Sequence, residues 1–385
     1  MKCKLLDICV FRKGKVDVSK LTLKTYISTE NMLPNKGGVT EASSLPTVQL
    51  TQEYKKGDIL VSNIRPYFKK IWQAKCDGGC SSDVLVFQGN LNIDGDFLYY
   101  ILANDDFFAY SMATSKGTKM PRGDKTSIMQ YEVPIFDIDT QRKIASVLRS
   151  LDEKIELNST INNNLEQQAQ AIFKSWFVDF EPFNGEMPHD WIASRLGDIA
   201  SIKTNSFSPV KNSDVQLEHY IIPAYDEKKY PVFESAAGVK SNKYILSKNS
   251  VMISKLNPDT KRVWRPMCLS ELAVSSTEFI IFEAFNPAYR DFVFSIVDSA
   301  AFSDWMCAHT TGSTNSRQRT APSTTLEFQV ALPDEKAITD FCAVVTPMYD
   351  TIASNICENQ KLAQLRDSIL PKLMSGELDV SNIDL

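Results

Sequence analysis

Residues Ile144 to Trp176 read IASVLRSLDEKIELNSTINNNLEQQAQAIFKSW, and this stretch decides the fold. Steps of alternately four and three residues from Ile144 give a nearly unbroken apolar seam, as at the a and d positions of a heptad repeat. The seam consists of Ile144, Leu148, Leu151, Ile155, Asn158, Asn162, Leu165, Ala169, Ile172 and Trp176. A helix of about 33 residues is roughly 50 Å long. Because one small domain does not need so long a seam, we expect the helix to pair with a second one.

That second helix lies about 197 residues further along the chain. Its seam consists of Phe341, Val345, Met348, Ile352, Asn355, Asn359, Leu362, Arg366, Ile369 and Leu373. Both seams carry two asparagines at the same two steps, Asn158 and Asn162 in the first and Asn355 and Asn359 in the second. A buried amide needs a polar partner and fixes the register of a helix pair. We therefore predict an antiparallel coiled coil whose register these four asparagines set; the alternative is that each helix packs only on its own domain.

The repeat extends beyond the helices, at offsets between 192 and 197 residues. Lys4 to Ile8 recurs as Arg195 to Ile199, and Tyr54 to Ser62 is echoed at Leu246 to Ser254. Further matches are Pro66 with Pro258, Trp72 with Trp264, Ser81-Ser82 with Ser275-Ser276, and Val84 to Phe87 with Phe279 to Phe282. The chain is therefore two copies of one module, each a globular domain followed by a long helix.

The predicted fold class is α+β, with two globular, mainly-β domains separated by two long helices. Short β-branched and aromatic runs, such as Ile59 to Ser62, predict a mainly antiparallel sheet in each domain. Helical stretches within the domains are few, chiefly Phe97 to Thr114 and Phe292 to Thr310. We predict a first domain at 1–139, a helix at 140–180, a linker at 181–189, a second domain at 190–333, a second helix at 334–376 and a tail at 377–385. Pro371 is expected to kink or end the second helix.

Composition predicts the cellular location of the protein and the state of its cysteines. No apolar run approaches the ~20 residues that span a bilayer, and Met1 to Lys4 does not begin a signal peptide, so we expect a cytoplasmic protein without membrane contact. The eight cysteines are scattered, and free thiols are expected. Cys76 and Cys80 are close together, but the three histidines are far from them in sequence, so no metal is implied.

Charge is unevenly divided. Residues 1–139 carry 18 basic and 16 acidic side chains, and residues 190–333 carry 15 of each. The remaining segments therefore hold the excess of acid that makes the whole chain −5. Nucleic-acid contact is expected only from local clusters in the two domains, whereas the acidic remainder suits protein partners.

No catalytic constellation is recognisable. A phosphate-binding glycine loop, a nucleophilic serine elbow and a zinc-protease motif are all missing from the sequence. Asn286-Pro287-Ala288-Tyr289 is similar to the [DNS]-P-P-[FYW] motif of amino-methyltransferases, but the first copy preserves none of it at Leu91 to Asp94. We interpret the segment as a strand-to-helix turn. A methyltransferase built around it remains an alternative, and a coiled-coil scaffold without a DNA role is another.

Four loops carry the residues that could recognise DNA. Arginine and lysine reach phosphates or the guanine edge, asparagine reaches the adenine edge, and glycine allows close backbone approach. The candidates are Arg65, Lys69 and Lys70; Lys116, Lys119, Arg122 and Lys125; Lys261 and Arg262, with Arg265; and Asn315, Arg317 and Arg319. The loops around Gly117 and Gly312 are favoured because they recur at equivalent places while their side chains differ. Ordinary solvated loops are the competing interpretation.

The stretches Thr140 to Asn158 and Ala171 to Phe180 closely resemble the central conserved helix of type I restriction-modification specificity subunits. The strand at Gly57 to Leu60, the Cys80-Ser81-Ser82-Asp83 step and the Gly117 loop are similar to that family's target-recognition domains. The second copy departs from the pattern, with Asn249-Ser250 in place of Gly57-Asp58 and Arg366 at an apolar seam position.

The resemblance implies a non-enzymatic, sequence-specific DNA-binding subunit. Each globular domain would recognise one half of a bipartite double-stranded target, and the coiled coil would set the spacing. It further implies that two methyltransferase subunits dock on the helices and that restriction/translocase subunits complete the nuclease. S-adenosylmethionine, ATP and Mg²⁺ are expected on those partners, and no cofactor is expected on this chain.

Overall fold

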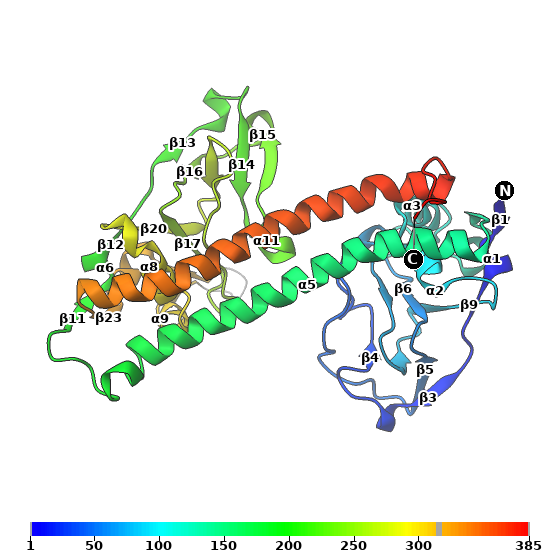
Figure 1. Ribbon diagram of the computed structural model, residues 1–385, viewed down its shortest axis with the longest axis horizontal. Helices are drawn as coiled ribbons and strands as arrows, with labels where there is room; N and C mark the ends of the chain where they lie inside the picture. The colour runs from blue at the N-terminus through cyan, green and yellow to red at the C-terminus, as the bar shows by residue number, and fades with distance from the viewer. Residues whose placement is uncertain (1, 313–317, 384–385) are drawn as a thin grey trace. The chain divides into compact units, whose positions relative to one another are not determined.

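The computed structural model describes residues 2–312 and 318–383. The chain divides into two compact units, one formed by residues 1–154 and 362–385 and the other by residues 155–361. The two long helices, α5 (Ile138–Phe177) and α11 (Glu335–Ser375), each contribute a segment to both units (Figure 1). The domain boundaries predicted from sequence assign each helix to one module, whereas packing assigns each helix to two units.

The globular part of the first unit contains two four-stranded sheets and one two-stranded sheet, with strand orders β2-β9-β6-β7, β3-β5-β8-β4 and β1-β10. The strands are β1 (Lys2–Lys4), β2 (Cys9–Phe11), β3 (Lys15–Asp17), β4 (Tyr26–Ile27), β5 (Leu50–Tyr54), β6 (Ile59–Ser62), β7 (Ile71–Gln73), β8 (Gly78–Cys80), β9 (Val84–Gly89) and β10 (Glu132–Pro134). The short helices are α1 (Leu5–Ile8), α2 (Gly95–Ala103), α3 (Asp105–Ala113) and α4 (Lys125–Ile128), with 3₁₀ turns η1 (Val18–Lys20) and η2 (Pro66–Phe68).

The second unit repeats this order. Its sheets are β12-β20-β17-β18, β13-β16-β19-β14-β15, β11-β23 and β21-β22. The strands are β11 (Ile192–Arg195), β12 (Ala200–Ile202), β13 (Ser206–Phe207), β14 (Gln216–Tyr220), β15 (Val232–Ser235), β16 (Lys243–Ile245), β17 (Ser250–Ser254), β18 (Val263–Trp264), β19 (Ala273–Ser275), β20 (Phe279–Ala284), β21 (Thr310–Thr311), β22 (Arg319–Thr320) and β23 (Gln329–Leu332). The helices are α6 (Leu196–Ile199), α7 (Ile222–Lys228), α8 (Arg290–Val297), α9 (Ala300–Ala308) and α10 (Pro322–Thr325), with 3₁₀ turns η3 (Glu181–Phe183), η4 (Pro209–Lys211), η5 (Ala236–Gly238) and η6 (Pro287–Tyr289).

The two copies therefore share a framework, and the predicted α+β class with mainly antiparallel sheets is confirmed. In each copy one pair of strands is parallel, β4 with β8 and β14 with β19. The recurring motif at Leu5 and Leu196 opens a one-turn helix in which an aspartate, Asp7 or Asp198, accepts the backbone N–H of the residue before the helix, at 2.8 and 2.9 Å.

Some expectations from the sequence need correction. The helical stretch expected over Phe97 to Thr114 is two helices, because the Asn104 side chain caps the start of α3. Its counterpart over Phe292 to Thr310 is likewise divided, at the cap Ser299. Pro371 does not end the second helix, since α11 continues to Ser375.

The apparent departure at Asn249-Ser250 preserves the turn. In the first copy the Asp58 carboxylate accepts the Lys55 backbone N–H at 2.8 Å, and in the second copy the Ser250 hydroxyl accepts the Ser247 N–H at 3.0 Å. A serine therefore closes the same local turn as the aspartate does.

The helices pair in both units. In the first, Leu148 of α5 and Leu370 of α11 share a core with the domain helices and with Val380 of the tail. In the second, Phe173 and Phe177 of α5 pack with Phe341 of α11. In each unit the largest apolar cluster is thus shared by a sheet, short helices and both long helices.

Candidate nucleic-acid interface

Each copy builds its candidate interface from two adjoining segments. One is the turn that follows the central strand, β6 or β17, and begins with an X-Pro step. The other is the glycine-containing loop around Gly117 or Gly312, which ends beside that turn. An isolated β-bridge joins Ile64 to Arg122 in the first copy and Leu256 to Arg319 in the second. The structure therefore brings together loops that are more than fifty residues apart in sequence.

An arginine anchors the glycine loop in each copy. Arg122 pairs with Asp83 at 3.1 Å, and the equivalent Arg319 pairs with Glu278 at 3.0 Å. The hydrogen bond to Glu278 raises the pKa of the Arg319 guanidinium. Because an arginine–carboxylate pair recurs at this place in both copies, we infer that these two arginines hold the loops to the sheet. Any contact that they make with a base would be additional to this structural role.

Most of the other predicted cations also have partners within the chain. Lys69 contacts Asp105 at 2.7 Å, Lys116 contacts Asp124 at 2.5 Å and Lys261 contacts Asp298 at 2.8 Å. Arg262 contacts Asp226 through two hydrogen bonds, and Lys70 donates to the Thr29 carbonyl oxygen at 2.6 Å. The Lys116 ammonium, together with backbone N–H donation from Ser127, lowers the pKa of Asp124 to about 2.

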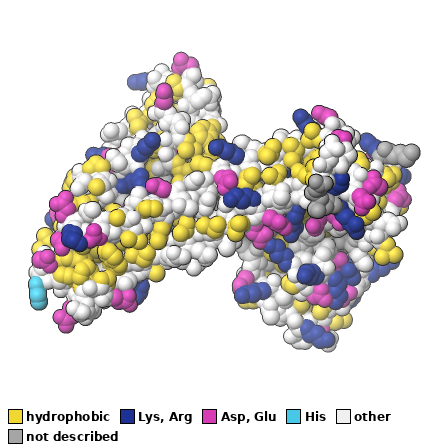
Figure 2. Space-filling model, in the orientation of Figure 1, with side chains coloured by type: hydrophobic (Ala, Val, Ile, Leu, Met, Phe, Trp, Pro, Cys, Tyr) yellow, Lys and Arg dark blue, Asp and Glu magenta, His cyan; other side chains and the backbone are white. Residues whose placement is uncertain are grey.

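The remaining candidates differ in setting. Lys119 is exposed in the Gly117 loop, and Lys125 is exposed at the start of α4. Asn315 and Arg317 lie outside the described residues. The DNA-contacting roles of all these side chains stay predictions. On the face drawn in Figure 2, basic and acidic side chains are interspersed rather than segregated, in keeping with the near-neutral charge of both domains.

Arg65 stands apart from the other cations. Its Nε atom is buried and has no hydrogen-bond partner among the described residues, and the same holds for the Oδ1 atom of Asn257 in the second copy. Arg65 is among the residues predicted from the sequence, whereas Asn257 is not, although the matching Pro66 and Pro258 align the two residues.

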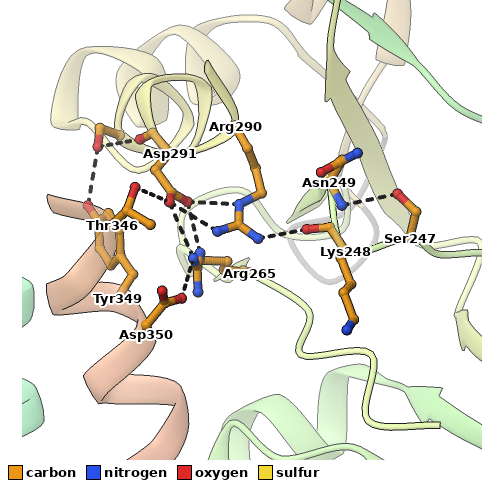
Figure 3. Close-up of polar contacts among 10 residues, drawn as sticks. Ser247, Lys248, Asn249, Arg265, Arg290, Asp291, Thr346, Tyr349 and Asp350 are labelled. Atoms are coloured by element: carbon orange, nitrogen blue, oxygen red, sulfur yellow. Dashed lines mark hydrogen bonds and ion pairs between the residues drawn. The ribbon is translucent and has the colours of Figure 1, made fainter. Parts of the chain in front are cut away.

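A polar cluster fixes the second domain on its helix (Figure 3). Asp291 of α8 accepts two hydrogen bonds from Arg265, at 2.8 and 3.2 Å, and two from Arg290, both at 3.0 Å. From α11, the Thr346 hydroxyl donates to the same carboxylate at 2.7 Å, and Asp350 contacts Arg265 at 2.8 Å. The turn after β18 is thereby tied both to α8 and to α11, so Arg265, proposed from sequence as a loop cation, is occupied in this attachment.

The first domain uses the same positions with different chemistry. Asp96, the equivalent of Asp291, accepts from the Gln73 amide at 2.7 Å. Gln73 in turn accepts from Arg149 of α5 at 3.2 Å. In the second copy the arginine of this contact, Arg265, follows strand β18, whereas in the first copy the arginine, Arg149, lies on the long helix α5. Each domain therefore contacts its long helix through a different set of side chains.

The four seam asparagines bond to one another within the second unit. Asn158 donates to Asn359 at 2.9 Å and to Glu358 at 2.7 Å, and Asn355 donates to Asn162 at 2.8 Å. The partner numbers fall along α11 as they rise along α5, so the segments are antiparallel. Arg366, the other polar seam residue, contacts Asp152 of α5 at 2.5 Å within the first unit.

The methyltransferase-like segment is a surface turn. Asn286 precedes η6, and its Oδ1 accepts the Ala288 N–H at 3.1 Å, which is an ordinary cap. In the part of the chain that the structure describes, no three potential ligand side chains gather where a metal ion could bind. No helix within residues 2–312 and 318–383 is both long and apolar enough to span a bilayer.

Comparison with known proteins supports the resemblance. The family model for the type I restriction modification DNA specificity domain matches residues 1–167. The type I restriction enzyme HindI specificity subunit of Haemophilus influenzae is 25% identical over 434 residues, with 92% of this chain and 94% of the relative covered. Residues 1–167 are thus similar to this specificity domain, and most of the chain is similar to type I restriction enzyme specificity subunits.

Two further relatives extend the match. The MjaIX specificity subunit of Methanocaldococcus jannaschii is 25% identical and covers 75% of this chain and 70% of its own length. The crystal structure of the type I restriction-modification S subunit from M. genitalium has the same fold, with a TM-score of 0.62, 16% identity and coverage of 97% of this chain and 96% of that one. The relatives are named as specificity subunits, the class that the sequence predicts. The second copy is recognised here through its sheet order, because the family model ends at residue 167.

Proposed function

We propose that each globular domain of this specificity subunit binds one half of a bipartite double-stranded DNA target. The observation that supports this is the contrast between framework and loops. Strand order, the arginine anchors Arg122 and Arg319, and the seam asparagines recur, whereas the loop side chains beside the anchors differ between copies. A duplicated frame with divergent loops suits recognition of two different sequences.

The two long helices supply the surface for protein partners. Leu157 and Val344 in the second unit and Leu365 in the first are exposed apolar side chains on α5 and α11. Together with the acidic excess outside the domains, these residues suit docking of two methyltransferase subunits. Those partners would bind S-adenosylmethionine, and restriction/translocase subunits would supply ATP- and Mg²⁺-dependent activity. Partner contacts to phosphates would compensate for the near-neutral domains.

Domain exchange tests the proposal. Residues 1–139 are replaced by the first domain of another family member, and the chain is assembled with its methyltransferase subunits. Methylation should change its sequence requirement in one half-site and keep the other. A change in both half-sites, or in neither, would contradict modular recognition.

Two alternatives are separated by simple controls. Transfer of a labelled methyl group to DNA by the purified chain alone would indicate a methyltransferase instead. If Lys119→Ala left both DNA affinity and sequence preference unchanged while Leu157→Asp abolished assembly, a coiled-coil scaffold without a DNA role would be favoured over DNA recognition.

A further inference from the structure

Arg65 and Asn257 occupy the same backbone conformation at equivalent positions. Their φ angles are 49° and 50°, in the left-handed region, and each precedes a proline, Pro66 or Pro258. This region is uncommon for residues other than glycine, and a following proline favours extended backbone instead. Glycine would suit the position best, yet both copies carry a planar polar side chain. Such retained strain points to a function for the side chain.

The backbone around the two residues repeats closely. The Arg65 N–H donates to the Pro121 carbonyl oxygen at 2.8 Å, and the Asn257 N–H donates to the Gln318 oxygen at 2.9 Å. Both contacts tie the turn to the end of the glycine loop. The position is therefore a fixed feature of the shared frame and not a local irregularity.

The next contacts repeat as well. The Arg65 carbonyl oxygen accepts from the Phe68 N–H, and that of Asn257 accepts from the Thr260 N–H, both at 3.0 Å. The φ angle and the backbone hydrogen bonds of this residue are therefore shared by both copies, whereas its side chain differs.

Both side chains keep polar atoms unused. In the part of the chain that the structure describes, the buried Nε of Arg65 and the buried Oδ1 of Asn257 have no hydrogen-bond partner. Neighbouring arginines behave differently, since Arg122 and Arg319 are paired with carboxylates in both copies. Buried polar groups are normally paired, so an unpaired one at the same place in both copies needs an explanation, and a functional role is one.

We propose that Arg65 and Asn257 select the base at equivalent positions of the two half-sites, Arg65 a guanine and Asn257 an adenine. Arginine forms two parallel hydrogen bonds with guanine O6 and N7, and asparagine forms two with adenine N6 and N7. A phosphate oxygen accepts from an arginine, but it has no hydrogen to donate to the unpaired Oδ1 of Asn257. This assignment rests on the proposed function, which it refines by naming the residue that discriminates.

The test uses the chain assembled with its methyltransferase subunits, S-adenosylmethionine and a library of DNA duplexes randomised around the wild-type target. The variants are Arg65→Gly, Asn257→Gly and Arg65→Asn. Glycine is favoured at both φ angles, so each glycine variant should keep the fold, with an unchanged or higher melting temperature. Asn184→Gly is the matched control, because Asn184 also has a left-handed φ, 62°, but lies exposed in the linker.

Arg65→Gly should lower discrimination for guanine at one position of the first half-site by about tenfold to a hundredfold. Asn257→Gly should do the same for adenine in the second half-site, Arg65→Asn should shift the preference from guanine to adenine, and Asn184→Gly should change no base preference.

A bipartite wild-type target whose base preferences survive both glycine variants would overturn the assignment while leaving the proposed function intact. A uniform loss of methylation across all bases would also overturn it, since that indicates phosphate contact. A wild-type complex with no bipartite target would refute the proposed function itself.

Discussion

Substitution of Asp291 by asparagine should strongly destabilise the second unit. The Asp291 side chain is 3% exposed and accepts hydrogen bonds from Arg265, Arg290 and Thr346. Removal of one partner from a buried ion pair costs roughly 3–5 kcal/mol, because the remaining charge stays buried without compensation. Asparagine keeps the shape and one acceptor oxygen, and Arg265 retains the exposed carboxylate of Asp350. We therefore expect the lower end of that range, about 3 kcal/mol.

The matched control is Asp96→Asn at the equivalent position of the first unit. Asp96 accepts from a neutral amide, that of Gln73, so its loss should cost about 1 kcal/mol. Hydrogen exchange resolved by segment is the suitable assay, since two units need not unfold together. Exchange in α8 of Asp291→Asn should accelerate roughly a hundredfold, about tenfold per 1.4 kcal/mol, and exchange in α2 of Asp96→Asn much less. Equal effects of the two variants, or an Asp291→Asn effect below about 1 kcal/mol, would refute this reasoning.

Three further outcomes follow from the contacts. Asn158→Leu alone should lower the denaturation midpoint, because the Oδ1 of Asn359 loses its donor. Asn158→Leu combined with Asn359→Leu should recover or exceed the wild-type midpoint, while cysteine crosslinking between the helices detects additional registers; an unchanged register would argue against the asparagines' role. Asp152→Asn should destabilise the first unit by about 1–3 kcal/mol, because Arg366 loses the carboxylate of Asp152 and keeps only that of the more exposed Asp367. Hydrogen exchange of the last turns of α11 measures the loss, and exchange like that of wild type would show the Arg366–Asp152 pair to be dispensable. Burial lowers the pKa of His219, so the folded chain binds fewer protons than the unfolded chain near that pKa. The free energy of unfolding should therefore fall as pH drops through about 6.5, the ordinary pKa of histidine. His219→Gln should reduce this pH dependence in urea titrations, and an unaltered dependence would contradict the role of His219.

The pairing of the seam asparagines depended on structure. Heptad spacing placed Asn158 and Asn162 opposite a matching pair, but it did not say which amide meets which. The structure pairs Asn158 with Asn359 and Asn162 with Asn355. Replacing Asn158 and Asn355 together would therefore leave one asparagine of each pair without its partner. The informative double variant replaces both members of one pair, Asn158 and Asn359.

The candidate interface was only partly predictable, for a physical reason. Residue type and loop position identify cations such as Arg262 but not the carboxylates that fold back to meet them, because Asp226 is 36 residues away. The significance of Asn257 depends on its φ angle and an unused oxygen, which composition does not encode. Repetition was the most reliable sequence signal, because both copies had to preserve the same core.

Mapping methylated bases across a genome that encodes this chain together with its methyltransferase subunits tests the central claim most directly. Two divergent recognition domains on a common framework predict one bipartite motif, with two different specified half-sites separated by a spacer of fixed length and unspecified sequence. Deletion of the gene for this chain should remove that methylation. A single continuous motif, or methylation that persists without the chain, would contradict the account.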